Sequence, residues 1–210
     1  MTLAIHICLG LAIAGLVVAV GWRLLSRRAS LPCPSWLAWL VELENPFAKN
    51  YNASTIIEHL NLQPGMNVLD VGCGPGRVTI PLAQAIGGRC NVVALDMQPR
   101  MLERARAKAQ SAHLTNIEFL EVAIDRGKFG NDQFDRVLLV TVLGEIPDRE
   151  SALQEIYRAL KPGGILSVTE IIVDPHYQSR RTILKLANAI GLREKAFYGS
   201  WFAFTIQLEK

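Results

Sequence analysis

The sequence predicts an α/β fold: a seven-stranded, mostly parallel sheet that ends in an antiparallel hairpin, preceded by one N-terminal transmembrane helix. Three observations support this prediction. Strand patterns alternate with helical patterns from residue 52 onward, only Gly199 and Ser200 separate the last two strand patterns, and residues 3–22 contain no Asp, Glu, Lys or Arg. Repeated strand–helix units build a parallel sheet, whereas a two-residue link permits only an antiparallel pair.

Residues 3–22 are long enough to cross a bilayer, because twenty helical residues at a rise of about 1.5 Å span roughly 30 Å. No basic residue precedes this run, and Arg23, Arg27 and Arg28 follow it. This asymmetry predicts a single-pass membrane protein whose main domain lies on the cytoplasmic side, with the lipid bilayer as a partner. A secretory signal peptide starts with a basic region, so a cleaved signal is the less favoured alternative, as is a buried helix.

The charges divide along the chain. The whole sequence has 22 basic and 19 acidic residues, and residues 1–28 hold three Arg and no acid. The domain that follows is therefore neutral, and the basic surplus lies where anionic lipid headgroups would attract it. A neutral domain gives no support for nucleic-acid binding. The four cysteines form no CxxC pair, so neither a metal site nor a disulfide framework is expected.

Residues 29–50 are predicted to form a linker and an interfacial amphipathic helix between the anchor, residues 1–28, and the main domain, residues 51–210. In this segment Trp36 and several aliphatic residues share one helical face. Trp36 and Trp39 suit the boundary between lipid headgroups and acyl chains. A helix packed on the domain is the alternative, and both interpretations remain open.

The first half of the main domain is divided by prolines and glycines. A helix over 52–60 ends before Pro64, and a second helix starts near Pro75 and ends at Gly87. A third helix is predicted over 98–111, where apolar residues recur on one face. The strands between these helices are expected at 67–71, 91–96 and 116–122.

The second half repeats the same alternation. The strand over 134–140 is mostly apolar, so both of its faces are expected to be buried. A helix over 148–160 ends at a Lys-Pro-Gly-Gly turn, and a helix over 178–190 stops at Gly191. The remaining strands are expected at 165–171, 192–198 and 202–209.

Glycines occupy every second position in the stretch DVGCGPG, which begins at Asp70 at the end of the first strand. Glycine lets the backbone turn sharply and lets a ligand approach closely, and the following helix offers free N–H groups. A dinucleotide loop of the form GxGxxG would need glycine where Arg77 stands, and a phosphate loop would need Gly-Lys-Ser/Thr. A compact zwitterion, such as the methionine end of S-adenosylmethionine (SAM), fits this spacing better than a pyrophosphate.

Asp96 ends the second strand, twenty residues after Gly76. A carboxylate in this place can accept hydrogen bonds from both hydroxyls of a ribose. Its position does not separate SAM from a nicotinamide dinucleotide. Asp96 can also be interpreted as the N-cap of the helix over 98–111, a role compatible with binding.

The motifs resemble those of the class I SAM-dependent methyltransferases, in particular the quinone- and sterol-methyltransferase-like branch (methyltransferase domain type 11). VLDVGCGPG is similar to the first motif of that family, and VVALDMQPRMLERARAKA is similar to its second strand and helix. FDRVLLVTVLGEIPDRESALQEIYRALKPGGILSVTE is similar to its later motifs. The resemblance covers roughly residues 50–210 and implies a Rossmann-like fold with SAM across the carboxyl ends of strands one to four.

The resemblance also implies a set of cofactor-binding residues. The methionine end is expected at Asp70, Gly72, Cys73, Gly74 and Gly76, the ribose and one adenine face at Asp96 and Met97, the adenine at Ala123, Ile124 or Asp125, and the sulfonium near Thr141. One departure concerns the adenine. Relatives often read Gly-Asp-Ala after the third strand, with the Asp on the adenine amino group, whereas this chain has Ala123 at that position.

Methyl transfer from a sulfonium is an in-line displacement, so the protein mainly supplies alignment and desolvation. A general base is needed only if the acceptor loses a proton. Candidates are Glu145 after the fourth strand, His176 after the fifth and Tyr51, each of which can also be a polar loop residue or a helix cap. Asp174 and Tyr177 are further base candidates. Relatives often carry a His near Gly144, and this chain lacks that histidine. His59 and His113 are expected on helices, with structural roles.

The resemblance and the predicted anchor together suggest a membrane-anchored SAM-dependent methyltransferase with a small, lipophilic or membrane-associated acceptor. A non-catalytic SAM-binding scaffold at the membrane is the alternative, and Ala123 favours it. A nicotinamide-dependent reductase is a third interpretation, which the failed GxGxxG frame opposes.

Overall fold

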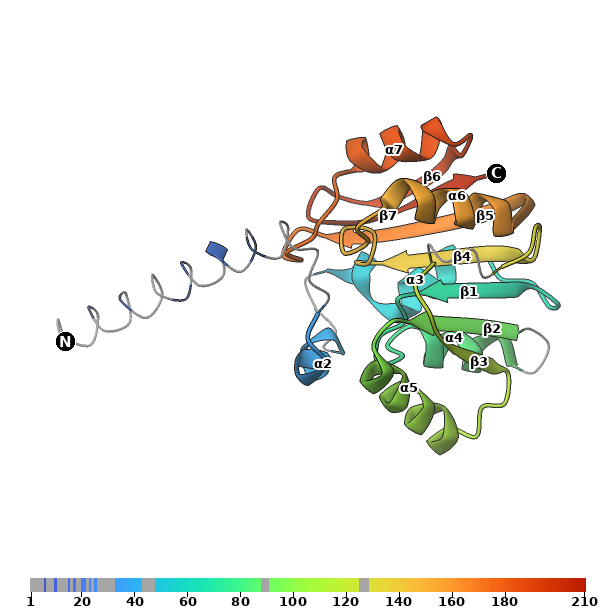
Figure 1. Ribbon diagram of the computed structural model, residues 1–210, viewed down its shortest axis with the longest axis horizontal. Coiled ribbons are helices and arrows are strands. Elements are labelled where there is room, and N and C mark those ends of the chain that lie inside the picture. Colours follow the sequence, from blue (N-terminus) through green and yellow to red (C-terminus); the bar gives the residue numbers. More distant parts are fainter. Residues whose placement is uncertain are drawn as a thin grey trace.

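The computed structural model describes residues 33–42, 48–87, 91–124 and 129–210, together with residues 6, 10, 15, 17, 20, 21, 23 and 25 (Figure 1). Most of the predicted transmembrane run over 3–22 lies outside the described residues, and so does Asp125. Within the described part of the chain, no helix combines the length and the apolar composition that a bilayer crossing requires.

The sheet has seven strands in the order β3-β2-β1-β4-β5-β7-β6. Both the number of strands and the mostly parallel sheet with a terminal antiparallel hairpin match the prediction. Strands β1 to β5 pair in parallel, and β7 is antiparallel to both β5 and β6. The bounds are β1 Asn67–Val71, β2 Asn91–Asp96, β3 Ile117–Glu121, β4 Phe134–Val140, β5 Leu160–Ile171, β6 Arg193–Gly199 and β7 Ala203–Glu209.

Helices cover both faces of the sheet (Figure 1). Alternate residues of a strand point to opposite faces. Val68 accordingly packs in a cluster with the first two domain helices, whereas its neighbour Leu69 packs in the cluster that contains the last two. The helices are α3 Ala53–His59, α4 Thr79–Ile86, α5 Pro99–Ser111, α6 Arg149–Ala159 and α7 Arg180–Ala189, and before them lie η1 Ser35–Leu37, α2 Ala38–Val41 and η2 Lys49–Tyr51.

Two element starts and the place of one histidine differ most from the prediction. Helix α4 begins at Thr79 rather than near Pro75, because residues 72–78 are occupied by the glycine turn. Strand β5 begins at Leu160, because the Lys-Pro-Gly-Gly segment pairs with the C-terminal residue Lys210 instead of ending a helix. His113 lies in the turn after α5, with φ 53°, so its predicted place on a helix is wrong. His59 is on α3 and stacks on Tyr198, as a structural residue would.

The carboxyl ends of the parallel strands and the β6–β7 turn meet at one edge of the sheet, which we call the carboxyl edge. The β4 arrow in Figure 1 points toward the end of the molecule at which α2 lies. The guanidinium of Arg23 donates a hydrogen bond of 2.9 Å to the carbonyl of Ile172, in the loop after β5. The N-terminal segment therefore joins the domain at its carboxyl edge.

Candidate functional site

The glycine loop between β1 and α4 is held against the end of β2. Gly72, Gly74 and Gly76 all have positive φ angles, of 69°, 54° and 82°. A Cβ on Gly72 would lie 2.6 Å from the Val142 side chain, and one on Gly76 would crowd Ile80 and Ala105. A Cβ on Gly74 would meet nothing within 4 Å. Gly72 and Gly76 therefore let neighbouring elements pack closely, whereas Gly74 borders open space that a ligand can enter.

Asp96 joins this loop to the end of β2. Its Oδ2 accepts a hydrogen bond of 2.9 Å from the Gly74 N–H, and its Oδ1 accepts one of 2.8 Å from the Gln98 N–H. The side chain is buried, and burial raises its pKa. Gln98 is the N-cap of α5, so the N-cap interpretation of Asp96 is wrong. The carboxylate instead fixes the loop and lies beside Met97, which is exposed to solvent.

Asp70 is buried between β1 and α4. It accepts a hydrogen bond of 2.6 Å from the Thr79 hydroxyl, and burial raises its pKa to about 6. Cys73 is also buried, among Ala94 and Leu102, and burial raises the pKa of its thiol. Both side chains support the loop from within, so the part of the loop free for a ligand is its backbone.

Arg77 follows the loop and is held by Tyr51. Its Nη1 donates to the Tyr51 carbonyl at 2.9 Å, and the guanidinium lies 4.1 Å from the centre of the Tyr51 ring. Its Nη2 is buried with no hydrogen-bond partner among the described residues. A buried guanidinium N–H without an acceptor is costly, so this group fits a carboxylate ligand. The open space at Gly74 and this unpartnered N–H are the two features near the loop that are compatible with a small zwitterionic ligand.

The end of β4 adjoins the same loop. Thr141 has an unusual φ of 55°, and its N–H donates to the Thr169 carbonyl of β5 at 2.9 Å. This turn directs Val142 against Gly72. Thr141 therefore lies where the fourth strand meets the glycine loop.

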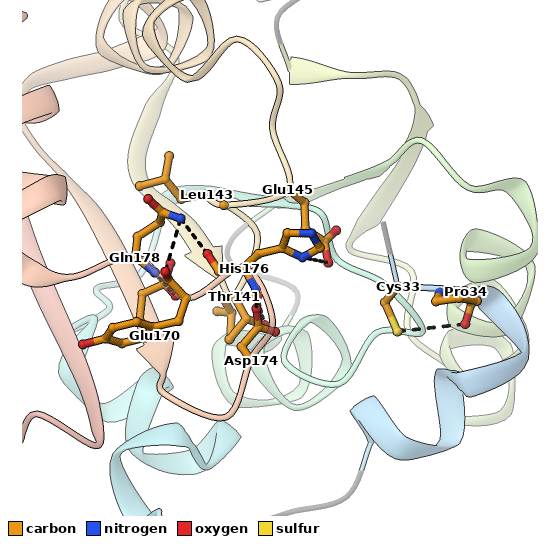
Figure 2. A network of polar contacts seen from close by, with 12 residues as sticks. Cys33, Pro34, Thr141, Leu143, Glu145, Glu170, Asp174, His176 and Gln178 are labelled. Carbon is orange, nitrogen blue, oxygen red and sulfur yellow. Dashed lines mark hydrogen bonds and ion pairs between the residues drawn. The ribbon is translucent and has the colours of Figure 1, made fainter. Parts of the chain in front are cut away.

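Glu145 and His176 come together beyond this turn (Figure 2). The Oε1 of Glu145 lies 3.8 Å from the Nδ1 of His176. Burial raises the pKa of Glu145 to about 8, and the charges of Asp174 and Asp96 add to the rise. His176 is 4% exposed, and its Nε2 is buried without a hydrogen-bond partner in the described chain. The pair is thus a carboxyl group that titrates near neutral pH beside an imidazole with an unused nitrogen.

The backbone of His176 crosses directly over Gly144. A Cβ on Gly144 would lie 1.9 Å from the His176 carbonyl oxygen, so only glycine fits there. The loop after β5 therefore places the His176 imidazole beside the loop after β4. The Asp174 carboxylate accepts a hydrogen bond of 2.7 Å from the His176 N–H and fixes that loop.

Glu170 was missed by the sequence reasoning. It lies at the end of β5, 1% exposed, and burial raises its pKa well above the usual range. Its Oε2 accepts from the Gln178 N–H at 3.1 Å, and the Gln178 side chain donates to the His176 carbonyl at 2.6 Å. The available signal was that Glu170 is the one charged residue of the predicted strand over 165–171. Glu170 supports the backbone that carries His176.

Segment 33–42 crosses the carboxyl edge. The Cys33 N–H donates to the Glu145 carboxylate, and the Cys33 carbonyl accepts from the Gln98 side chain at 2.9 Å. At its other end, Glu42 pairs with Lys108 of α5 at 2.6 Å. The Cys33 thiol has its pKa raised to about 11 by burial and by Glu145, so it stays protonated at neutral pH.

The remaining predicted residues make other contacts. Tyr51 contacts Arg77 and an apolar cluster with Ile171. Ile124 is buried in the main core, and Ala123 is half-buried after β3. No contact in the described residues assigns a partner for an adenine amino group at Ala123.

Comparison with known proteins agrees with this geometry. A family model described as a methyltransferase domain matches residues 62–198. A demethylmenaquinone methyltransferase from Listeria welshimeri is 38% identical over 108 residues, which cover 51% of this chain and 46% of that protein. The chain thus matches about half the length of this curated relative.

Solved structures show the same fold. A SAM-dependent methyltransferase from Aquifex aeolicus superposes with a TM-score of 0.75 and 19% identity, covering 84% of this chain and 98% of its own. The magnesium protoporphyrin IX methyltransferase of Synechocystis, solved with bound SAM, gives a TM-score of 0.59 and 22% identity, covering 75% and 76%.

The glycine loop, the carboxylate at the end of β2 and the family match over most of the domain lead to one assignment. The chain belongs to the methyltransferase domain family, as a class I methyltransferase domain that uses SAM as its cofactor.

Proposed function

We propose that this chain methylates a lipophilic quinone at a membrane surface, with Glu145 as the general base. The observation that carries the proposal is the Glu145–His176 pair at the carboxyl edge, because it supplies a proton acceptor beside the turn that contacts the glycine loop. The relative named demethylmenaquinone methyltransferase supports a quinone as the acceptor class.

The binding residues follow from the site. The open backbone at Gly74 and the free Nη2 of Arg77 would hold the amino-acid end of SAM, and Asp96 would hold the ribose. When bound, SAM supplies a methyl group already activated on a sulfonium. Thr141 and the loop after β4 exclude water from the space between the cofactor and the acceptor.

The quinol form of a quinone presents a hydroxyl proton and an electron-rich ring carbon. Glu145 Oε1 would take the hydroxyl proton, and the ring carbon would accept the methyl group as the methyl–sulfur bond breaks and S-adenosylhomocysteine leaves. The hydrogen on that carbon would then leave as a proton, and Glu145 would return its proton to the oxygen, which restores the quinol. His176 orients Glu145 and can take the proton from it at Nδ1, the ring nitrogen 3.8 Å from Oε1, while its buried Nε2 has no hydrogen-bond partner among the described residues. The pKa of about 8 at Glu145 suits a base that works near neutral pH.

We further propose the domain organisation that the sequence predicts. Residues 1–28 form a single-pass membrane anchor with a basic flank, residues 29–50 a linker with an interfacial helix, and residues 51–210 the methyltransferase domain on the cytoplasmic side. The charge-free run over 3–22 and the attachment of Arg23 to the carboxyl edge support this arrangement.

The test is to incubate the full chain with isotope-labelled SAM and membrane extract and to identify labelled lipids by mass spectrometry. We expect label in a quinone, together with release of S-adenosylhomocysteine. A Glu145→Gln variant should bind SAM normally and lose about 100-fold or more in turnover. Labelling of another lipid class would overturn the quinone assignment.

A non-catalytic SAM-binding scaffold is the second candidate, and Ala123, where relatives often carry Asp, favours it. Calorimetric titration with SAM followed by assay of S-adenosylhomocysteine separates the two. Tight binding without turnover on any membrane fraction would establish the scaffold.

A further inference from the structure

The exposed large apolar side chains of the domain gather at one end of the molecule. Met97 follows β2, Val173 follows β5 and Trp201 lies in the β6–β7 turn, and these three side chains are 60%, 63% and 75% exposed. Trp36 and Trp39 are also exposed, on the segment that crosses the carboxyl edge. We call these five side chains the apolar rim.

The rest of the described domain surface differs. Among residues 33–42, 48–87, 91–124 and 129–210, one other large apolar side chain is exposed, that of Phe197 in β6. The Arg180 guanidinium covers the Phe197 ring, 4.7 Å from its centre. At the opposite edge of the sheet, a groove of about 550 Å³ is lined largely by polar residues, among them Asn67, Asn91, Asn116, Asp132, Gln133 and Lys161. The apolar rim is therefore a property of the carboxyl edge.

Hydrogen bonds connect the rim to the N-terminal segment. Arg23, directly after the charge-free run, donates to the Ile172 carbonyl next to Val173. The Ile172 N–H donates to the Phe202 carbonyl at 2.8 Å, which joins this loop to the turn that carries Trp201. The described residues Val17, Val20 and Leu25 of the N-terminal segment are exposed as well. The apolar rim is thus bonded to Arg23, the residue that follows the charge-free run over 3–22 in the sequence.

We propose that the apolar rim docks on the surface of a lipid bilayer, so that the carboxyl edge faces the membrane and a lipid-dissolved acceptor enters the site directly from it. Tryptophan is suited to the headgroup boundary, and aliphatic side chains insert below it. Exposed apolar patches on a soluble domain mark an interaction surface. The attachment of Arg23 beside Val173, directly after a charge-free run of twenty residues in the sequence, selects the bilayer over a protein partner.

This docking deepens the proposed function and rests on its membrane attachment. It also explains the position of the Glu145–His176 pair, which lies at the same edge as Val173 and Trp201. The loop after β5 carries both Val173 and His176, and the Tyr177 hydroxyl donates to the Trp201 carbonyl at 3.5 Å. An acceptor that leaves the bilayer at the rim therefore arrives beside the base.

The test measures the depth of Trp201 in the membrane. The full chain, with Trp22, Trp36 and Trp39 replaced by Phe, is reconstituted in vesicles of phosphatidylcholine and phosphatidylglycerol that contain brominated lipids. We expect strong quenching of Trp201 fluorescence by the bromines and weak quenching by a water-soluble quencher. The control carries Thr115→Trp as its single tryptophan, at the exposed opposite edge, and should show the reverse pattern.

Equal accessibility of the two tryptophans to the brominated lipids would overturn the docking, and so would failure of the full chain to associate with the vesicles. A second variant, Val173→Asp with Trp201→Asp, should raise the KM for a long-tailed quinol in vesicles about tenfold and leave the KM for a short-chain soluble quinol unchanged. An equal loss on both substrates would also count against docking. Absence of methyl transfer to either quinol in the unmodified chain, with Trp201 quenched, would instead remove the proposed function and leave the docking intact.

Discussion

The three glycines of the loop have different physical roles, although they share positive φ angles. Gly72 and Gly76 are required by close contacts with Val142, Ile80 and Ala105, whereas Gly74 is adjacent to open space. The sequence predicted the loop from the glycine spacing alone. It could not separate packing from binding, because that distinction depends on which side chains from later strands and helices approach each glycine.

Gly74→Val should therefore abolish SAM binding with only a small loss of stability. The added side chain fills the space of the ligand, and the left-handed backbone costs about 1–2 kcal/mol. Calorimetry with SAM and thermal unfolding would measure the two effects. Gly72→Ala is the matched control, because its clash with Val142 should lower the melting temperature more than Gly74→Val does.

Asp96→Ala should weaken SAM binding about tenfold or more, since it removes the acceptor for the ribose and releases the Gly74 N–H. Circular dichroism should show that the fold is retained. Asp96→Asn keeps one oxygen acceptor, so its affinity for SAM is expected to lie between those of the wild type and Asp96→Ala. Wild-type affinity in the Ala variant would contradict the placement of the ribose.

The raised pKa of Glu145 predicts opposite effects of pH on activity and stability. The base works when it is deprotonated, so kcat/KM should rise as pH increases toward about 8 and then level off. The folded protein binds this proton more tightly than the unfolded chain does, from the ordinary pKa of 4.5 up to about 8. The contribution of Glu145 to stability is therefore complete below pH 4.5 and is lost as pH rises toward 8.

Urea unfolding of the wild type and Glu145→Gln at pH 5 and pH 8 checks this sign. The wild type should lose more stability between the two pH values than the variant, because the variant has no carboxyl group to ionise at this position. The reverse order would show that Glu145 is already charged at pH 5.

At the level of elements, the strands were predicted more accurately than the turns between them. The bounds of β1, β2 and β4 match the prediction, because apolar runs bounded by turn residues define a buried strand. The start of β5 was wrong because Pro162 and two glycines normally end a structure. Here the C-terminal residue Lys210 pairs with this segment, and a pairing partner 46 positions away leaves no local signal.

The junction between the parallel and antiparallel parts of the sheet contains a buried hydroxyl pair. Thr169 of β5 and Thr205 of β7 are fully buried, and their hydroxyl oxygens lie 2.8 Å apart. Thr205→Val should cost about 1–3 kcal/mol, because it leaves the Thr169 hydroxyl without its partner. The double variant with Thr169→Val should cost less than the sum of the single variants, as measured by urea unfolding.

At the scale of the whole molecule, the chain is asymmetric along the strand direction. The glycine loop, the Glu145–His176 pair and the apolar rim share the carboxyl edge, and polar residues line the groove at the other. The sequence predicted which residues follow the strands, and hence most of the cofactor site. It did not predict the contacts of Cys33 or the pairing of Glu145 with His176, since both join loops that are far apart in the chain.

Deletion of residues 1–28 should lower turnover of a vesicle-embedded quinol strongly and change turnover of a soluble quinol little. The reason is that a tethered domain meets membrane-dissolved acceptors at a high effective concentration. Initial rates on the two substrates, with and without the deletion, give the comparison. Equal rates in all four cases would contradict a role for the segment in substrate access.

The contact between Gly144 and the His176 backbone also limits how this site can change. Any side chain introduced at position 144 would push away the loop that holds the imidazole. The two loops are therefore expected to show strong epistasis, and libraries that vary one loop alone should yield mostly inactive proteins. Paired substitutions across residues 144 and 174–178 are the route by which the specificity of this site could be redesigned.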